Sequence, residues 1–275
     1  MLVRTVVGII IAVVLLAALA NQYVFVVVFA LAFLLAIDEM HRMFKGKGLK
    51  VFMIPSYIFA GSFGPLYLLT KEFGDAGMAT ALLFAYSMLL FVSTIIGQVF
   101  YCKNDCTPAI FSLVPLIYPL LSACALVFMY FGLKERVIGI TATAVAILAP
   151  LASDVLAYFG GVLFGKHPLC PNISPKKTVE GSIFGVIGGM LMGMLLYFLQ
   201  GFWGASTDWH TMLVIGLLCG VAGQFGDLYA SSIKRWAGIK DFSSLLPGHG
   251  GILDRLDSTW VCAPIVLCYL LLMGY

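Results

Sequence analysis

Stretches of about 20 consecutive apolar residues recur along the whole chain, and few folds can accommodate them. A run of this length can cross the hydrocarbon core of a bilayer as a helix, because a helix satisfies its own backbone hydrogen bonds. The chain is 61% hydrophobic and only 11% charged, whereas soluble domains are roughly half apolar and about a quarter charged. The ten-residue alternating segments of a membrane β-barrel are not seen. The sequence therefore predicts an all-α, polytopic integral membrane protein.

The apolar stretches predict about nine transmembrane helices. They cover residues 3–20, 22–40, 50–70, 77–101, 107–132, 136–160, 179–201, 210–230 and 258–274. No linker or internal repeat separates them, so we expect one membrane domain over residues 1–275. Within it, residues 1–150 are expected to be mainly scaffold, and residues 151–275 are expected to carry a catalytic site.

The positive charges predict the orientation of these helices. If the N-terminus lies inside, only Lys71, Lys134 and Arg136 of the 16 lysines and arginines fall on the outer side. Inner loops are enriched in lysine and arginine, so the N-terminus is expected in the cytoplasm and the C-terminus outside. The end of the first run, "LLAALANQ", also resembles a signal-peptide cleavage site, and loss of this helix stays an alternative. The mildly basic balance gives no reason to expect a nucleic-acid partner.

Three charged segments fall on the predicted inner side. In the first, "SDVLAYFGGVLFGKHP", Asp154 and Tyr158 are four residues apart and share a helix face. A carboxylate within an apolar helix is costly and usually marks a polar cavity or partner. The alternative is an aspartate close enough to the membrane surface to be merely solvated.

The second segment is "PNISPKKTVEGSIFG". Ser174 and Pro175 resemble an N-cap and a first helical residue, so Lys176 and Lys177 are expected in the first turn of the helix. Two ammonium groups beside a helix N-terminus suit an anion, phosphate above all. Anchoring to anionic lipid is the alternative for these lysines.

The third segment, Ser231 to Ser258, reads "SSIKRWAGIKDFSSLLPGHGGILDRLDS". Just before it lies Asp227, which forms one helix stripe with Ser231 and Lys234; a simple ion pair within this stripe is the alternative reading. The "PGHGG" turn could wrap an oxyanion with its backbone amides. Asp254 and Asp257 follow at the start of the last helix.

These residue types suit chemistry at phosphorus. Mg²⁺ prefers oxygen ligands and typically takes one or two carboxylates plus substrate phosphates. Asp227 and Asp254 could hold a metal pair that stabilises attacking and leaving oxygens, while lysine and arginine neutralise developing charge. Whether a monovalent cation also takes part stays open.

The third segment resembles the signature of the phosphatidate cytidylyltransferases, or CDP-diacylglycerol synthases. The match runs from Ser231-x-Ile-Lys-Arg through Lys240-Asp241 and His249-Gly-Gly to Asp254-Arg-Leu-Asp257 without a departure. The "ISPKKTVEG" and "SDVLAYFGG" segments also resemble blocks of that family, so the similarity covers about the C-terminal half. The first 150 residues agree only in being membrane helices.

The resemblance implies a Mg²⁺-dependent integral membrane enzyme that works as a homodimer and makes CDP-diacylglycerol and pyrophosphate from CTP and phosphatidic acid. It implies Asp227 and Asp254 as metal ligands. We expect catalytic roles for Asp227, Lys234, Arg235, Asp254, Arg255 and Asp257. We expect substrate-binding roles for Asp154, Lys176, Lys177, Ser231, Lys240, Asp241, His249, Gly250 and Gly251.

This reaction needs no strong general base, because a phosphomonoester is already ionised near neutral pH. His249 would donate to a phosphate oxygen or serve only the turn. We expect an enzyme of the bacterial inner (plasma) membrane, with its site facing the cytoplasm. The rival readings are a transporter, a kinase of a polyprenyl or related alcohol, and cytidylyl transfer to another lipid phosphate.

Overall fold

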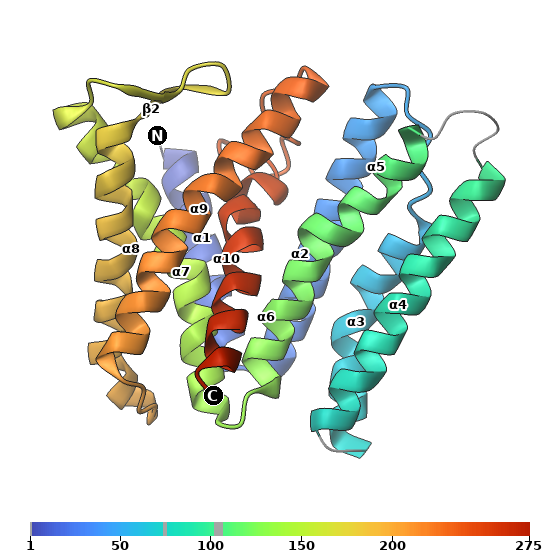
Figure 1. Cartoon of the computed structure of the whole chain (residues 1–275), viewed down its shortest axis with the longest axis horizontal. Coiled ribbons are helices and arrows are strands. Elements are labelled where there is room, and N and C mark those ends of the chain that lie inside the picture. The colour runs from blue at the N-terminus through green and yellow to red at the C-terminus, as the bar shows by residue number, and fades with distance from the viewer. Residues whose placement is uncertain (1, 74–75, 102–106) are drawn as a thin grey trace. The chain divides into compact units, whose positions relative to one another are not determined.

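The computed structural model describes residues 2–73, 76–101 and 107–275, most of them helical (Figure 1). The elements are α1 (Leu2–Ala20), α2 (Gln22–Gly46), α3 (Ile54–Phe73), α4 (Ala76–Tyr101), α5 (Thr107–Pro115), the π-helix η1 (Leu116–Leu120), α6 (Leu121–Gly132), α7 (Arg136–Phe164), β1 (Pro168–Cys170), β2 (Ser174–Thr178), α8 (Val179–Leu199), the 3₁₀-helix η2 (Gln200–Trp203), α9 (Trp209–Ala237) and α10 (Leu253–Leu272).

Among the described residues, six helical stretches are long and apolar enough to cross a membrane. They are Gln22–Gly46, Ile110–Gly132, Arg136–Phe164, Val179–Trp203, Trp209–Ala237 and Leu253–Leu272. Shorter apolar helical stretches cover Thr5–Ala20, Ile54–Leu69 and Ala85–Gly97. The prediction of a helical, multi-pass membrane protein is confirmed, while the count of about nine spans and their orientation stay predictions.

The chain forms two compact units. The N-terminal unit comprises Met1–Val127 and Asp241–Arg255, and the C-terminal unit comprises Phe128–Lys240 and Leu256–Tyr275. The segment that resembles the family signature is therefore divided. Its loop, residues 241–252, belongs to the N-terminal unit, although it follows α9 in the chain.

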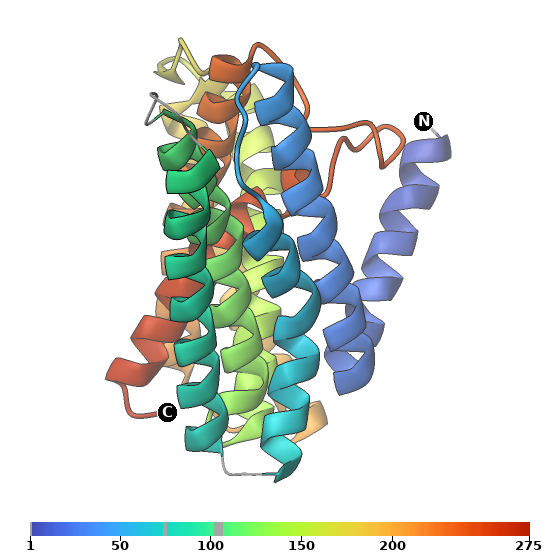
Figure 2. The same ribbon diagram turned by 90° about the vertical axis from the view of Figure 1, so that its right-hand side faces the viewer.

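Helix α2 forms the core of the N-terminal unit and packs against α1 and α3. Its N-terminus is capped by Asn21, whose side chain accepts hydrogen bonds from the N–H groups of Tyr23 and Val24. A face that includes Phe25, Phe29, Phe33, Ile37 and Met40 is buried, as expected for apolar residues three or four positions apart. The loop 241–252 is non-helical and extended (Figure 2), and His249 lies next to Gly8 of α1.

Helices α7, α8 and α9 pack closely in the C-terminal unit because glycines lie where the backbones meet. A β-carbon on Gly189 of α8 would lie 2.5 Å from the carbonyl oxygen of Gly216 on α9. Helix α10 approaches α9 in the same way, since a β-carbon on Gly226 would lie 2.7 Å from the carbonyl oxygen of Asp257. Small residues at helix contacts are typical of membrane bundles, where close approach supplies the packing energy.

The expected helix start at Ser174 and Pro175 is wrong. These residues begin strand β2, which pairs antiparallel with β1 to form a small hairpin that leads into α8 (Figure 1). The helix begins at Val179, and its N-cap is Thr178, whose hydroxyl accepts the N–H of Gly181 at 3.1 Å. A pairing partner across the turn and a second capping residue outweigh the local signal of Ser174. Lys176 and Lys177 therefore lie on a strand.

Candidate functional site

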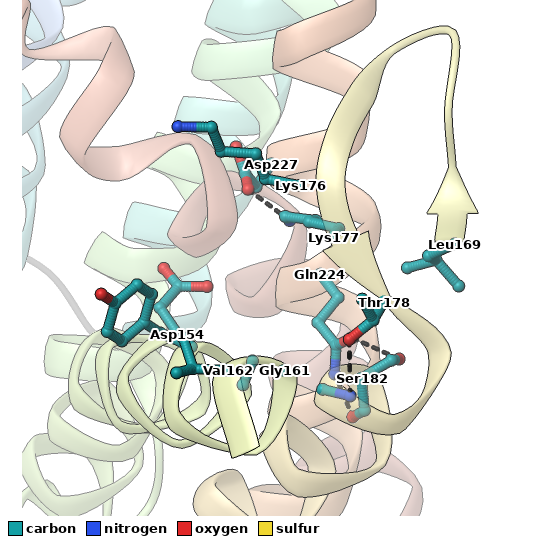
Figure 3. Close-up of a pocket in the computed structure, with 13 residues that line it drawn as sticks. Asp154, Gly161, Val162, Leu169, Lys176, Lys177, Thr178, Ser182, Gln224 and Asp227 are labelled. Atoms are coloured by element: carbon teal, nitrogen blue, oxygen red, sulfur yellow. Dashed lines mark hydrogen bonds and ion pairs between the residues drawn. The ribbon is translucent and has the colours of Figure 1, made fainter. Parts of the chain in front are cut away.

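Helices α7, α8 and α9 and the β-hairpin enclose a pocket of about 410 Å³ in the C-terminal unit (Figure 3). Four of the predicted site residues line it, namely Asp154, Lys176, Lys177 and Asp227. The apolar part of the lining includes Ala157, Tyr158, Val162 and Leu169. The pocket thus offers cationic and anionic groups next to an apolar wall, as a site for an amphiphilic substrate requires.

The polar end of the pocket is organised by an ion pair between Lys177 of β2 and Asp227 of α9 (Figure 3). Each of these side chains is 27% exposed. The ammonium group of Lys177 is buried and, among the residues that the structure describes, has no other hydrogen-bond partner. Ser231, one turn after Asp227, makes only a long contact of 3.4 Å to its carboxylate. The cation that pairs with Asp227 in this contact comes from the hairpin and not from its own helix stripe.

Gln224 lies one turn before Asp227 and joins α9 to α8 beside the pocket. Its amide nitrogen donates to the backbone oxygens of Ser182 at 3.0 Å and Gly220 at 2.7 Å. Its amide oxygen accepts the hydroxyl of Ser182 at 2.5 Å. The side chain of Gln224 is buried, and both its amide oxygen and its amide nitrogen are hydrogen-bonded. It therefore fixes the position of the neighbouring Asp227 along α9 relative to α8.

Asp257 brings a further carboxylate from α10 into this unit. It is 7% exposed, and its Oδ1 accepts the backbone N–H of Ser258 at 2.7 Å. It interacts electrostatically with Asp227, with Lys234 and with Asp154. Among the residues that the structure describes, no three His, Cys, Asp or Glu side chains lie together as a ready metal cage.

Asp254 organises the signature loop in the N-terminal unit. Its Oδ2 accepts the backbone N–H groups of Phe242 at 2.8 Å and Gly251 at 3.0 Å. Between these points the chain turns sharply, with Leu246 and Gly250 paired and positive φ angles at Gly248 and Gly250. Glycine adopts this left-handed region without the strain that a β-carbon causes. The sequence correctly placed a tight turn here.

Glu39 of α2 also contacts this loop, and the sequence analysis missed it. Its carboxylate accepts the hydroxyl of Ser243 at 2.6 Å and the N–H groups of Ile252 at 2.9 Å and Leu253 at 2.8 Å. The side chain is fully buried. A carboxylate in an otherwise apolar span was the available signal, but Glu39 fell at the predicted helix end, where charge is ordinary.

The remaining predicted residues lie nearer the surface. Lys240, Asp241, Arg255 and Arg235 are exposed, and the Arg235 side chain makes a long contact of 3.4 Å to the backbone oxygen of Ile173 in the hairpin turn. Of the predicted metal pair, Asp227 belongs to the C-terminal unit and Asp254 to the N-terminal unit. The two-metal site therefore stays a prediction.

Comparisons with known proteins identify the family of this chain. The chain matches the model of the cytidylyltransferase family over residues 2–273. It is 32% identical over 244 residues to a phosphatidate cytidylyltransferase of Staphylococcus haemolyticus, covering 88% of this chain and 89% of that protein. A Staphylococcus saprophyticus protein of the same name is 33% identical over 97% of both chains. Phosphatidate cytidylyltransferase 5, chloroplastic, of Arabidopsis thaliana is 33% identical over 87% of this chain and 64% of its own length. The chain belongs to the cytidylyltransferase family.

Proposed function

We propose that this protein is a phosphatidate cytidylyltransferase, which transfers CMP from CTP to phosphatidic acid and releases CDP-diacylglycerol and pyrophosphate. The observation that carries the proposal is the pocket where Lys177 meets Asp227, in a chain that matches the cytidylyltransferase family from residue 2 to residue 273. The relatives' shared name supports phosphatidate as the acceptor.

The reaction is one displacement at phosphorus. An ionised phosphate oxygen of phosphatidic acid attacks the α-phosphorus of CTP, a new P–O bond forms, and the bond to the β,γ-pyrophosphate breaks. The attacking oxygen needs no deprotonation, because the second pKa of a phosphomonoester is about 6. The protein must mainly hold two polyanions in line and stabilise the charge of the leaving group.

The basic residues of the C-terminal unit are suited to this work. Lys176 and Lys177 line the pocket, and Lys234 follows on α9, where it acts electrostatically on Asp257. A phosphate that enters the pocket would draw Lys177 from Asp227, since the ammonium group has a single carboxylate partner to exchange. The apolar wall beside Tyr158 and Val162 would accept the lipid part of the acceptor.

The donor set fits Mg²⁺. Asp227 is partly exposed at the pocket and offers the oxygen ligands that this ion prefers. Asp254 would be the second ligand, although its Oδ2 already accepts two backbone N–H groups. If these carboxylates and the substrate phosphates hold it, Mg²⁺ would supply positive charge that offsets negative charge on the transferring group.

The lysine and arginine distribution supports a pocket on the cytoplasmic side, where CTP is available. Phosphatidic acid would enter sideways from the bilayer. We also propose that the protein forms a homodimer and lies in a bacterial inner membrane. These two points rest only on the resemblance of the signature segment to the family.

The test is a reconstituted reaction. The protein, purified in detergent–lipid micelles, is given CTP, Mg²⁺ and phosphatidate, and both pyrophosphate and CDP-diacylglycerol are measured. A matched reaction with excess chelator should give neither product. Product formation from ATP and a lipid alcohol, with none from CTP and phosphatidate, would replace the proposal with a kinase. Faster turnover of a different lipid phosphate would change the acceptor while keeping the chemistry.

A further inference from the structure

We propose that Glu39 is a positioning residue for the signature loop, so that a helix from the N-terminal half of the chain controls the geometry of the reaction. The inference rests on the proposed function only where it concerns turnover. Its structural part stands on contacts within the N-terminal unit, which contains both α2 and residues 241–255.

Within the part of the chain that the structure describes, three hydrogen bonds reach the Glu39 carboxylate, and in each of them the partner is the donor. Oε1 accepts the hydroxyl of Ser243 and the N–H of Ile252, and Oε2 accepts the N–H of Leu253. An ionised carboxylate accepts only, so its chemistry matches this set of partners. Hydrogen bonds to a charged acceptor are about twice as strong as neutral ones.

Two of these donors are the N–H groups at the start of α10. Helix α10 begins at Leu253, and the first N–H groups of a helix have no partner within it. A capping residue usually lies next to them in the chain, whereas Glu39 reaches them from another helix. The carboxylate thereby fixes where α10 begins and joins that point to α2.

Gly251 makes this contact close. A β-carbon at this position would lie 2.5 Å from both oxygens of Glu39. The second glycine of the "HGG" motif, Gly251, is therefore explained by the Glu39 carboxylate that packs against it. No positive φ angle is involved at Gly251, so an alanine there would be opposed by Glu39 and not by the backbone.

The loop is thus held by two carboxylates, which accept N–H groups of Gly251 and of the two residues that follow it. Asp254 accepts the N–H groups of Phe242 and Gly251, and Glu39 accepts those of the next two residues. His249 and Asp254, which we expect in the reaction, lie on this braced segment. If Glu39 is lost, both residues lose a fixed position while their own side chains remain.

A simpler role, a surface charge at the end of a span, does not suit Glu39. Its side chain is fully buried, and a buried carboxylate costs free energy unless it is well bonded. The neighbouring Asp38 is closer to the surface role, because it is 44% exposed and pairs with Arg42 at 2.6 Å. It also accepts the hydroxyl of Tyr57 at 3.2 Å, a bond that an asparagine oxygen can still accept. These two adjacent acids give a matched pair for an experiment.

The experiment compares Glu39→Gln and Glu39→Ala with the control Asp38→Asn. An amide at position 39 would keep an oxygen toward Ser243 and Ile252 but would turn an NH₂ group toward the N–H of Leu253. Steady-state kinetics with CTP and phosphatidate measure turnover per folded molecule. Hydrogen–deuterium exchange measures the protection of residues 241–253, and thermal unfolding in detergent reports the global fold.

We expect Glu39→Gln to lower kcat by about 10- to 100-fold, the range found when partners of active residues are removed, with faster exchange confined to the loop. Glu39→Ala should lower kcat further and speed exchange of the loop more. Asp38→Asn should match the wild type in kcat and in loop exchange. Equal exchange of the loop in Glu39→Gln and wild type would overturn the inference. So would a loss that appears only as less folded protein at unchanged kcat.

Gly251→Ala supplies a second, independent test. Its effect on loop exchange should be large in the wild-type background and small in Glu39→Ala, because the second change removes the atoms with which the new β-carbon collides. Additive effects would contradict the proposal. The exchange measurements do not depend on activity, so a wild-type protein that fails to make CDP-diacylglycerol would refute the proposed function and leave this inference standing.

Discussion

Lys177 on the β-hairpin and Asp227 on α9 form an ion pair at the polar end of the pocket, and no hydrogen bond from another described residue reaches the lysine ammonium group. The pair joins two segments whose local structures are unrelated. In this pair each residue is bound to the other, whereas in the proposed reaction Lys177 would bind a phosphate and Asp227 a metal ion. Under the proposed function, this pair would be the arrangement without substrates, and bound substrates would replace it with their own contacts.

Removing Lys177 should impair turnover without unfolding the protein. We expect Lys177→Met to lower kcat/KM by about 100-fold, since a cation aimed at developing phosphate charge is commonly worth that much. Lys134→Met is the control, because Lys134 is exposed and bonds only the backbone oxygen of Gly274 among the contacts described. Product formation from CTP and phosphatidate measures the effect.

The double variant Lys177→Met/Asp227→Asn separates a structural pair from a catalytic one. If each single change impaired turnover only by leaving its partner as an unpaired charge, neutralising both partners would restore turnover. We expect no recovery, because each residue has its own task once substrates bind. Recovery to within a few-fold of wild type would show that our assignment of both residues is wrong.

Asp254→Asn should uncouple loop structure from chemistry. The asparagine side-chain oxygen can accept the N–H groups of Phe242 and Gly251 that Oδ2 of Asp254 now accepts, so hydrogen exchange of the loop should stay near wild type. Turnover should be abolished, because the amide lacks the charge that a metal ligand needs. Asp254→Ala should lose both the protection of the loop from hydrogen exchange and turnover. An active Asp254→Asn variant would remove Asp254 from the metal site.

Gln224→Leu should loosen the junction of α8 and α9. The change removes three hydrogen bonds, two to Ser182 and one to the backbone oxygen of Gly220. Each bond contributes about 0.6 kcal/mol on average within membrane proteins, so unfolding in detergent should occur at a clearly lower temperature. Ser182→Ala removes one of the three and should cost less. The reverse order of these two variants would argue against Gln224 as the organising residue.

Gly189→Ala tests the glycine packing of α8 on α9. The added β-carbon would meet the carbonyl oxygen of Gly216 at 2.5 Å and the α-carbon of Gly220 at 2.7 Å, both of them backbone atoms. Overpacking of this kind typically costs about 1–3 kcal/mol. Gly201→Ala is the matched control, because nothing lies within 4 Å of a β-carbon there. Gly189→Ala should therefore unfold at a lower temperature than Gly201→Ala. Equal unfolding temperatures would mean that α8 and α9 can move apart at little cost.

Much of the architecture was readable before the structure. Apolar runs such as residues 136–160 predict helices because hydrocarbon offers no partner for the backbone, and α7 covers that run from Arg136 to Phe164. The "PGHGG" turn was predictable from its glycines, two of which have positive φ angles. The start of α8 was not predictable from Ser174 and Pro175, since a strand needs a partner and that partner is β1.

The sequence by itself determined what kind of protein this is: a helical membrane enzyme whose charged residues gather in a few segments. Only the tertiary structure decided which charges meet. Lys177 pairs with Asp227, and Glu39 reaches the start of α10. The physical reason is that hydropathy and capping act over a few neighbouring residues, whereas these contacts depend on how whole helices pack. Packing brings together side chains that no local pattern relates.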